Sequence, residues 1–464
     1  KESGGCLVDL EKVPLKYQGL APWQIWISES QERMTLAVPK KSWTAFKKIM
    51  DRHDVEAIRI GVFTNSGKCI VRNRSKTVMN MSMEFLHDGR PIVLQRSKAV
   101  ERKNPEPSAS TRAISPEKAL LAILARPSVG STSFISQQYD HEVQGMSVTK
   151  PLQGKGRVNA DAAVIRPLYD SDRGIVLAHG LTSWYSQIDT YAMAAAAIDT
   201  AVRNAICAGA SRDYLAILDN FCWSSSGKPE RLYELKRAAE ACFDVATAYG
   251  TPFISGKDSM FNDFRGFTEK GEPIHIAALP TLLVSAIGVI PDVRQAMTID
   301  WKQEGDAVYL LGETNDELGA SEYFQMLGAA GNVVPRVDVK KNMKTYDAIS
   351  KAINAGFVAS AIGVGRGGLG VALAKQSIAG QIGARIDLTK IPGKAKQADS
   401  VLFSESQGRV VVSVRPTCEK AFKEICQGVA LTRIGETGGP ALSIDIKGAH
   451  VEVPLPSLTD AYRS

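Results

Sequence analysis

The sequence predicts an α/β or α+β fold that contains two copies of one structural unit. Between residues 150 and 290, apolar segments typical of strands alternate with segments typical of helices. In addition, the tetrapeptide SESQ occurs at 28–31 and again at 404–407, and similar residues surround both occurrences. Self-similarity of this kind indicates a duplicated unit of structure.

The similarity continues on both sides of the tetrapeptide. ISESQERMTLAVPKKSWTAFKKIM in the first copy aligns without gaps with FSESQGRVVVSVRPTCEKAFKEIC in the second. After short gaps, VDLEKVP (8–14) aligns with IDLTKIP (386–392), and IRIG (58–61) aligns with TRIG (432–435). The second copy has more than 200 residues between residue 150 and IDLTKIP, whereas very few residues precede VDLEKVP. We therefore expect the first unit to be truncated at its N-terminal side.

The first copy predicts the order strand, helix, strand, strand over residues 20–100. RMTLAV (33–38) alternates loosely, as a strand does, and SWTAFKKIMDRH (42–53) places apolar side chains three residues apart, as a helix does. AIRIGVF (57–63) and KCIVRN (68–73) are joined by TNSG and predict a hairpin.

A linker and a short helix are expected next. Residues 101–115 are rich in Pro, Ser and charge. A helix then begins with Ser115 as its N-cap and Pro116 in its first turn, and Pro127 ends it.

Further along, the chain predicts alternating helices and strands. The helices cover AMAAAAIDTAVRNAICAGA, ending at Gly209, and KPERLYELKRAAEACFDVATAYG, ending at Gly250. YLAILDNF is predicted as a buried strand, TPFISGKDSM as a strand that runs into a loop, and LPTLLVSAIGVIPDV as a strand pair. A further strand, AVYLLG, and the Gly-rich GVGRGGLGVALAKQSIAG precede the second SESQ.

Composition excludes several classes of protein. The chain has 464 residues, 44% hydrophobic and 23% charged, with a net charge of +7. No apolar run reaches the ~18 residues of a membrane span, and no basic run is interleaved with aromatics. The seven cysteines show no CxxC spacing, which is typical of reduced thiols in a cytosolic protein. We therefore expect a cytoplasmic protein that binds neither membrane nor nucleic acid.

The SESQ residues are candidate ligand contacts. Glu29, Ser30 and Gln31 offer a carboxylate, a hydroxyl and a carboxamide in succession, which together can hold a polar ligand. A single SESQ would more often be an ordinary loop, but the repetition makes a functional role as well supported as a structural one.

Two further segments are candidate phosphate contacts. In SGKDS, Gly256 lets backbone N–H groups approach a phosphate, Lys257 supplies a positive charge and Ser259 supplies a hydroxyl. The Walker A spacing is absent, and a plain turn is the alternative. Asp219 is placed at the C-terminal end of an apolar strand, where open α/β sheets bind ligands, although it could equally cap the next helix.

The Gly-rich segment GRGGLGVALAK (365–375) is a third candidate. It predicts a turn into a helix, whose free N–H groups can hold an anion, and a closely packed helix start is the alternative. The six histidines form no HxxxH pair, and the only one whose charged neighbours make it a candidate is His141, in YDHEVQG.

Several of these segments resemble a known family. They are AIDTAVRNAICAGA, LDNFCW, YGTPFISGKDS, PTLLVSAIGVIPDV, WISESQERM, EFLHDG and QYDHEVQG. Together they closely resemble the synthetase subunit of phosphoribosylformylglycinamidine synthase, over nearly the whole chain. Such enzymes contain tandem N-domain plus C-domain units, shared with aminoimidazole ribonucleotide synthetase. The resemblance implies that 1–100 is the C-terminal part of the first C-domain, 101–149 a linker with a helix, 150–292 the second N-domain and 293–464 the second C-domain.

The resemblance also implies an activity. The family converts formylglycinamide ribonucleotide to formylglycinamidine ribonucleotide with ATP and Mg²⁺, and the ammonia comes from glutamine through a glutaminase. Expected partners are therefore a glutaminase subunit, a small accessory subunit and the missing N-terminal half of the same enzyme. The family's catalytic His lies in a Trp-Ser-Glu-His-like segment that this sequence lacks, so no catalytic residue is assigned here.

Carried over by motif, Glu29, Ser30, Gln31 and Ser259 would contact the ribonucleotide substrate. Asp219 and Gly256 would contact ATP, and Lys257 falls beside them, where short-chain members carry a metal-binding Asn. The SESQ at 404–407 would be the symmetry-related relic of a working site at 28–31.

Long members of the family have a second nucleotide site with acidic metal ligands. Asp161 and Asn204 survive at matching positions, but Thr200 stands where a Glu is usual and Arg366 replaces an Asp. Because Arg cannot ligate a cation and Mg²⁺ prefers carboxylates, we expect weak or absent metal binding there, with Arg366 free to meet a phosphate.

Two other functions remain open at this point. One is a non-catalytic scaffold half that holds a nucleotide and docks partner subunits. The other is a different ATP-dependent enzyme of the same superfamily, such as a small-molecule kinase resembling selenophosphate synthetase. The paired SESQ and GTPFISGKDS argue against the second.

Overall fold

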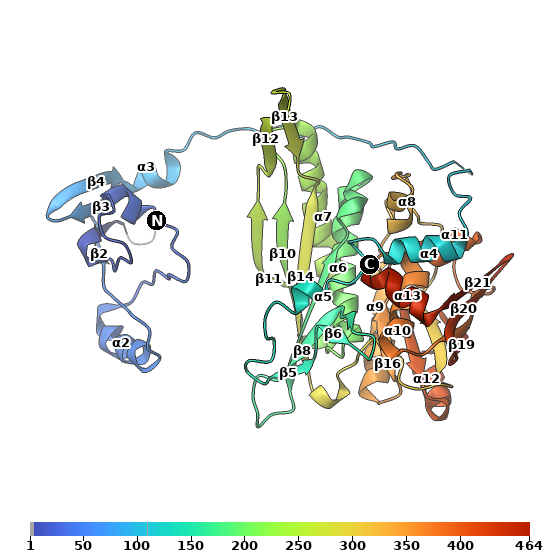
Figure 1. Ribbon diagram of the computed structural model, residues 1–464. Helices are drawn as coiled ribbons and strands as arrows, with labels where there is room; N and C mark the ends of the chain where they lie inside the picture. The colour runs from blue at the N-terminus through green and yellow to red at the C-terminus, as the bar shows by residue number, and fades with distance from the viewer. Residues whose placement is uncertain (1–3, 109) are drawn as a thin grey trace. The chain divides into compact units, whose positions relative to one another are not determined.

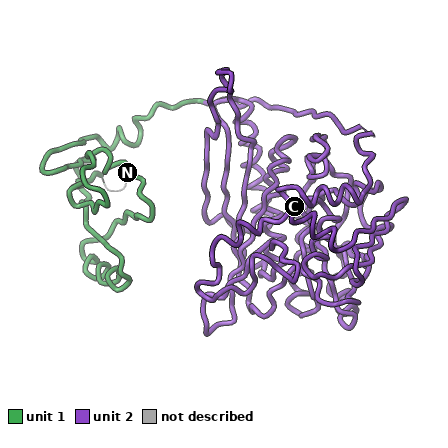
Figure 2. The backbone as a smooth tube through the Cα atoms, in the orientation of Figure 1, with its two compact units in different colours: residues 1–94 green, residues 95–464 purple. Residues whose placement is uncertain are grey.

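The computed structural model describes residues 4–108 and 110–464 (Figure 1). The chain divides into two compact units, Lys1–Leu94 and Gln95–Ser464, called unit 1 and unit 2 below (Figure 2). Both combine helices with mixed sheets, which confirms the predicted class. None of the helices in the described ranges has both the length and the apolar composition that crossing a bilayer requires.

Unit 1 is built on a four-stranded sheet with the order β2-β1-β3-β4. β1 (Cys6–Asp9) is antiparallel to β2 (Gly61–Phe63) and parallel to β3 (Lys68–Asn73), and β4 (Lys76–Ser82) is antiparallel to β3. Its α-helices are α1 (Pro22–Trp26), α2 (Trp43–Arg52) and α3 (Met83–Asp88). The buried cluster of this unit consists of Leu10, Ile25, Cys69 and Val71.

Two expectations for unit 1 are wrong, although α2 confirms the predicted helix. The hairpin of 57–63 with 68–73 does not form, because β1 lies between β2 and β3 in the sheet. The predicted strand at 33–38 has no regular structure, whereas its counterpart β18 (Val410–Val414) is a strand between two others. No strand in the described part of unit 1 pairs with 33–38, and an extended segment needs such a neighbour to satisfy its backbone.

The first part of unit 2 is a six-stranded sheet with the order β11-β10-β14-β9-β8-β5. Its long helices are α6 (Thr190–Cys207) and α7 (Pro229–Tyr249), where Gly250 ends α7 in a left-handed conformation with φ 69°. The strands are β5 (Ser147–Thr149), β8 (Ala162–Ile165), β9 (Gly174–Leu181), β10 (Leu215–Cys222), β11 (Phe253–Ser259) and β14 (Thr281–Ile290).

One prediction within this sheet is confirmed and another is wrong. TPFISGKDSM is a strand that runs into a loop, since β11 ends at Ser259 and Met260 has no regular structure. The segment 279–293 contains one long strand, β14, rather than a strand pair. The remaining elements here are the β12 (Asp263–Phe267) and β13 (Pro273–Ala277) hairpin, the β6 (Leu152–Gln153) and β7 (Val158–Asn159) pair, and α5 (Ser133–Ser136).

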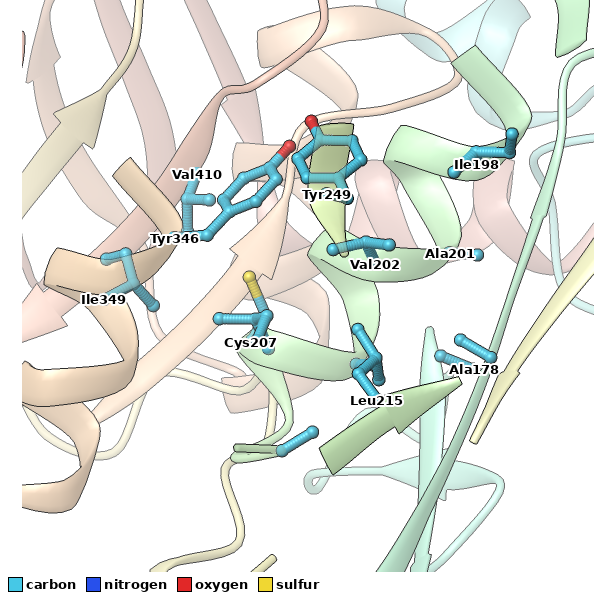
Figure 3. Close-up of a cluster of buried hydrophobic side chains, with 14 of the residues drawn as sticks. Ala178, Ile198, Ala201, Val202, Cys207, Leu215, Tyr249, Tyr346, Ile349 and Val410 are labelled. Atoms are coloured by element: carbon cyan, nitrogen blue, oxygen red, sulfur yellow. The ribbon is translucent and has the colours of Figure 1, made fainter. Parts of the chain in front are cut away.

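Helix α6 lies between two sheets, and nearly all of its residues are buried. One side packs on β9 and β14, where a Cβ at Gly180 would lie 2.0 Å from the carbonyl oxygen of Ala197. It also packs on β16 and α9, and the close-up of this core shows Tyr346 and Ile349 of α9 near Val202 and Cys207 of α6 (Figure 3). Alanines in this helix therefore permit close contact on both sides, as their small size predicts.

The second part of unit 2 is a seven-stranded sheet with the order β16-β18-β15-β19-β17-β20-β21. Its additional strands are β15 (Ala307–Leu311), β16 (Ser360–Gly363), β17 (Ala384–Asp387), β19 (Leu431–Thr437), β20 (Ala441–Ile446) and β21 (Ala449–Pro454). Its helices are α8 (Glu322–Met326), α9 (Val339–Asn354), α10 (Gly368–Gly380), α11 (Ala398–Phe403), α12 (Glu419–Ile425) and α13 (Leu455–Arg463).

The four strands β19-β17-β20-β21 repeat the sheet of unit 1 in order, direction and register. In unit 1, Val8 is paired with Gly61 and Val71; in unit 2, Ile386 is paired with Gly435 and Ile444. The two glycines also serve the same purpose, because a Cβ at either would collide with a carbonyl oxygen of the neighbouring strand. The fold therefore confirms the duplication that the sequence predicts.

The predicted linker and helix are also present. Residues 101–108 have no regular structure, and α4 (Pro116–Leu124) begins where expected. The Ser115 side chain accepts a hydrogen bond from the Lys118 N–H, as an N-cap does. Burial of Leu120, Ile123 and Leu124 fixes α4 on the second sheet's core.

Candidate functional site

The first SESQ forms an exposed loop in unit 1. The Arg33 guanidinium donates to the Ser28 carbonyl oxygen at 2.5 Å, and the Ser28 and Ser30 hydroxyls lie 2.8 Å apart. Glu29 and Gln31 are exposed and make no side-chain hydrogen bond to the described residues. The loop is thus held by its own arginine, and its carboxylate and carboxamide are free to bind a ligand.

A second cluster lies on adjacent strands of unit 2, where β10 and β11 run parallel and Asp219 is in register with Gly256. The Lys257 N–H donates to Asp219 Oδ1 at 3.3 Å, and a Cβ at Gly256 would lie only 2.5 Å from the same oxygen. Side chains alternate along a strand, so the Lys257 ammonium and the Ser259 hydroxyl, which contact each other, project from the face of β11 opposite to the Asp219 carboxylate. The structure therefore brings Asp219 together with Gly256 on one face and Lys257 together with Ser259 on the other.

This cluster differs from the one expected. Asp219 lies within β10 and not at its end, and SGKDS is an edge strand instead of a phosphate-cradling turn. Partial burial raises the pKa of Asp219, although the hydrogen bond from Lys257 opposes that rise. One face of this strand pair thus offers the Asp219 carboxyl group beside Gly256, and the other face offers the ammonium of Lys257 and the hydroxyl of Ser259.

A cavity of about 740 Å³ in unit 2 contains the residues expected at the second nucleotide site. Asp161, Thr200, Asn204 and Arg366 all line it, and these residues come from segments far apart in the sequence. Asn204 donates to the His179 carbonyl oxygen at 3.2 Å, which fixes its amide in the wall. The tertiary structure therefore assembles this set as the resemblance implied.

Two basic side chains face this cavity. Among the described residues, Arg366 donates only to carbonyl oxygens, those of Leu181 at 2.8 Å and Ser128 at 3.3 Å. Within residues 4–108 and 110–464, Lys375 has no hydrogen-bond or ion-pair partner; burial lowers its pKa and Arg366 adds to the effect, whereas the nearby carboxylates of Asp161 and Glu322 oppose it. Lys375 was not predicted as a site residue, because GVALAK indicates only a helix. The signal that could have identified it is its position as the one charged residue of an otherwise apolar helix.

These residues do not fit a divalent cation. Mg²⁺ requires several oxygen ligands, preferably carboxylates, and the cavity wall offers one carboxylate, Asp161, with the side-chain amides of Asn159, Asn204 and Gln407. In the described residues there is no group of three His, Cys, Asp or Glu side chains that could hold a metal. The two cations instead fit an anion.

The second SESQ is buried, and the Glu405 side chain within it binds the backbone of the Gly-rich loop. Glu405 Oε1 accepts from the backbone N–H groups of Gly367 and Glu322, at 2.8 and 2.9 Å, and Oε2 accepts from the Tyr185 hydroxyl at 2.6 Å. Burial and the Glu322 carboxylate raise the pKa of Glu405 to about 7. The anion expected on this loop is therefore the protein's own carboxylate.

Gln407 connects this loop to the cavity and to a buried ion pair. Its amide oxygen accepts from Thr200 at 3.3 Å and from Arg203 at 3.1 Å. Arg203 also pairs with Asp199, which accepts hydrogen bonds from the hydroxyls of Tyr249 and Tyr346 at 2.5 and 2.7 Å. Thr200 is thus part of this hydrogen-bond network.

The sequence matches two family models. AIR synthase related protein, C-terminal domain, matches residues 1–73 and 303–447, and AIR synthase related protein, N-terminal domain, matches 159–290. The order C-terminal, N-terminal, C-terminal domain agrees with the predicted tandem arrangement.

Curated relatives cover the whole chain. Phosphoribosylformylglycinamidine synthase subunit PurL from Methanothermobacter marburgensis is 33% identical over 468 residues, which are 100% of this chain and 61% of that protein. PurL from Methanocaldococcus jannaschii is 32% identical over 445 residues, 95% of this chain and 58% of that protein. The chain therefore spans about three fifths of the length of these relatives.

Solved structures share the fold. Thermotoga maritima PurL complexed with ADP has a TM-score of 0.58 at 20% identity, over 94% of this chain and 60% of that chain. T. maritima PurL complexed with FGAR has a TM-score of 0.56 at 19% identity, over 77% and 55%. From the two domain matches, the duplicated sheet and these relatives, we conclude that the chain belongs to the AIR synthase related protein family, as a relative of the phosphoribosylformylglycinamidine synthase synthetase subunit.

Proposed function

We propose that this chain is part of the ATP-dependent enzyme that converts formylglycinamide ribonucleotide to formylglycinamidine ribonucleotide in purine biosynthesis. The observation that carries the proposal is the 33% identity to a PurL subunit over the entire chain. In the proposed reaction, the formyl amide oxygen attacks the γ-phosphate of ATP, ADP leaves, and ammonia then displaces phosphate from the iminophosphate. Because the chain spans 61% of that relative, the activity proposed is that of the larger protein.

The exposed SESQ loop is proposed to hold the ribonucleotide. Glu29 and Gln31 provide acceptors and donors suited to sugar hydroxyls, and Ser30 adds a hydroxyl that already contacts Ser28. Ser259 is proposed as a further substrate contact, since its hydroxyl lies at the end of β11 beside Lys257.

ATP is proposed to bind at Asp219, Gly256 and Lys257. The lack of a Cβ at Gly256 keeps the Asp219 carboxylate accessible along the strand, and the Lys257 ammonium can neutralise phosphate charge. Mg²⁺ accompanies ATP in this proposal and supplies charge neutralisation for the phosphates. The share of this cluster in its coordination would be the Asp219 carboxylate.

The cavity is proposed as a second nucleotide site that works without a metal. Arg366 and Lys375 would neutralise phosphate oxygens directly, where Asp161 and Asn204 alone hold a cation weakly. The hydrogen bonds of Arg366 support this assignment, because among the described residues its guanidinium donates to carbonyl oxygens and forms no ion pair, and it lines the same cavity as Lys375.

The remaining parts of the proposal follow from the family. Ammonia would come from glutamine through a glutaminase subunit, with a small accessory subunit and the rest of the synthetase completing the complex in the cytoplasm. The domain boundaries proposed are 1–100, 101–149, 150–292 and 293–464.

The test uses the full-length polypeptide that carries this sequence. With ATP, Mg²⁺, ammonium chloride and formylglycinamide ribonucleotide, it should release phosphate only when the ribonucleotide is present. Gln31→Ala and Glu29→Gln should lower kcat/KM at least about tenfold, while Glu32→Gln on the same loop should change it little. Absence of ribonucleotide-dependent phosphate release by the unmodified protein would refute the proposal.

Calorimetry with ADP tests the cavity separately. ADP should bind equally with and without Mg²⁺, and Arg366→Ala with Lys375→Met should weaken binding at least about tenfold. In Thr200→Glu with Arg366→Asp, binding should become Mg²⁺-dependent. Mg²⁺-dependent binding by the unmodified protein would contradict the metal-free assignment.

A further inference from the structure

We propose that Cys6 and Cys69 form a reversible intramolecular disulfide, which makes them an oxidation-sensitive modification site of unit 1. The two sulfur atoms lie 3.4 Å apart, and the residues are in register on the neighbouring strands β1 and β3. Adjacent strands are about 4.8 Å apart, within the Cα separation of about 4.4–6.8 Å that disulfides span. Bond formation therefore needs small side-chain movements and no rearrangement of the sheet.

The second copy of this sheet shows that the fold does not require thiols here. The corresponding pair on β17 and β20 is Ala384 with Leu442, and both side chains are fully buried. An apolar pair thus fills the same place equally well. The thiol pair in unit 1 is consequently a separate property of this copy, and the second copy supplies a natural redox-inert replacement.

The pair is chemically asymmetric. Cys6 is partly exposed, whereas Cys69 is 5% exposed. Burial and the contact with Cys6 raise the pKa of Cys69 to about 11. Cys6 is therefore the thiol that reacts first with a soluble oxidant, and Cys69 is the thiol that resolves the product.

The oxidant proposed is a low-molecular-weight disulfide such as oxidised glutathione. The Cys6 thiolate attacks one of its sulfurs, forms a mixed disulfide and releases one glutathione thiolate. Cys69 then attacks the Cys6 sulfur and releases the second, and the two protein thiol protons end on the two glutathiones. The sum is two protein thiols plus one glutathione disulfide giving one protein disulfide plus two glutathiones.

The bond would close the segment that carries the first SESQ. Residues 6–69 include the loop at 28–31 and helix α2. Unit 1 has a small buried cluster, of which Cys69 is one of four members. A covalent link between β1 and β3 should therefore stabilise unit 1 in particular.

No other thiol pair competes. All seven cysteines are free, and across residues 4–108 and 110–464 no other two cysteine sulfurs lie within hydrogen-bonding distance. Cys418 is partly exposed, and the hydrogen-bond partner of its thiol in the described residues is the Thr417 hydroxyl, which makes it a suitable control.

The experiment treats the full-length, folded protein with oxidised glutathione and maps its peptides by mass spectrometry without reduction. The expected product contains a peptide in which Cys6 is joined to Cys69, and dithiothreitol restores both thiols. In Cys69→Ser, Cys6 should accumulate as the glutathione mixed disulfide. In Cys6→Ser, Cys69 should stay free, and Cys418→Ser should form the same linked peptide as the unmodified protein.

A second readout does not depend on single-cysteine variants folding. Protease cleavage between β1 and β3 of the oxidised protein should leave the fragments joined until a reductant is added. Cys6→Ala with Cys69→Leu copies the second sheet, should fold, and should give separated fragments under all conditions. Free Cys6 and Cys69 after treatment, a stable glutathione adduct on Cys6 in the unmodified protein, or links between different chains would each overturn the proposal.

Discussion

The two SESQ loops have the same internal geometry and opposite surroundings. Arg33 donates to the Ser28 carbonyl oxygen at 2.5 Å in unit 1, and Arg409 donates to the Ser404 carbonyl oxygen at 2.5 Å in unit 2. Each loop also ends in a residue with positive φ, Glu32 at 60° and Gly408 at 78°. Yet residues 29–31 are exposed, whereas 404–407 are buried.

The difference shows that tertiary packing decides whether the same local structure is buried or exposed. In unit 2 the strand that follows the loop lies between β15 and β16, and Glu405 is enclosed by Tyr185, Glu322 and Gly367. In unit 1 the described residues contribute no such enclosure. The same tetrapeptide is thus a buried part of the core in unit 2 and an exposed polar loop in unit 1.

The largest contrast is expected between removal of Arg33 and removal of Arg409, the arginines that donate to the first serine carbonyl of each SESQ loop. Arg409 is fully buried and also donates to the Ser406 carbonyl oxygen and the Thr314 hydroxyl, so Arg409→Ala should leave three buried acceptors unsatisfied and a cavity. We expect a loss of about 3–5 kcal/mol in the free energy of unfolding of unit 2. Arg33→Ala, with one exposed hydrogen bond, should cost about 1 kcal/mol or less in unit 1. Urea titration with peptide-resolved hydrogen exchange separates the two units, and equal losses would contradict the comparison.

The next contrast is in pH dependence. Folding raises the pKa of Glu405 from 4.5 to about 7. Its contribution to the free energy of unfolding is therefore complete below pH 4.5 and is lost as the pH rises through 7, by about 3 kcal/mol. Glu405→Gln stays neutral and should flatten this part of the stability profile of unit 2.

Unit 1 of the Glu405→Gln protein is the internal control, and its pH profile should match that of unit 1 in the unmodified protein. Thermal unfolding between pH 4.5 and 8, read separately for each unit by hydrogen exchange, checks both units. An unaltered profile for Glu405→Gln would show that this carboxyl group does not titrate in the folded state.

A third experiment tests the symmetry itself. Gly61→Ala and Gly435→Ala would place a Cβ 2.4 Å from the Leu7 carbonyl oxygen and 2.0 Å from the Arg385 carbonyl oxygen, respectively. Each should cost about 2 kcal/mol in its own unit, because the paired strand must move. Denaturant titration measures both, and tolerance of alanine at one of the two positions alone would break the equivalence of the sheets.

The smallest effect concerns the left-handed residue of each loop. Glu32→Gly should stabilise unit 1 by about 1 kcal/mol, since glycine adopts φ 60° without a steric cost. The reciprocal change Gly408→Ala should destabilise unit 2, where the new Cβ would lie 2.0 Å from Asn342 Oδ1. Differential scanning fluorimetry with hydrogen exchange resolves the two shifts, and destabilisation by Glu32→Gly would indicate that Glu32 makes a stabilising contact.

Much of the candidate site could be predicted from local sequence. The repeat could be recognised because both copies need the same residue at certain positions. Gly61 and Gly435 are an example, since a Cβ at either would collide with the neighbouring strand. Asp161, Asn204 and Arg366 were grouped through the resemblance to the family, and all three line the cavity. Lys375 and Gln407 were not assigned to this cavity, because their exposure to it depends on helix and loop packing.

Sequence by itself determined the elements whose cause is local: the capped helix after Ser115, the helix ending at Gly250 and the loop held by Arg33. Tertiary structure alone decided that β1 separates β2 from β3, that 33–38 is not a strand, and that Glu405 fills the Gly-rich loop. The physical reason is that caps and glycine turns are satisfied within a few residues. Strand pairing and burial of a carboxylate, by contrast, depend on partners hundreds of residues away or on partners that the segment lacks.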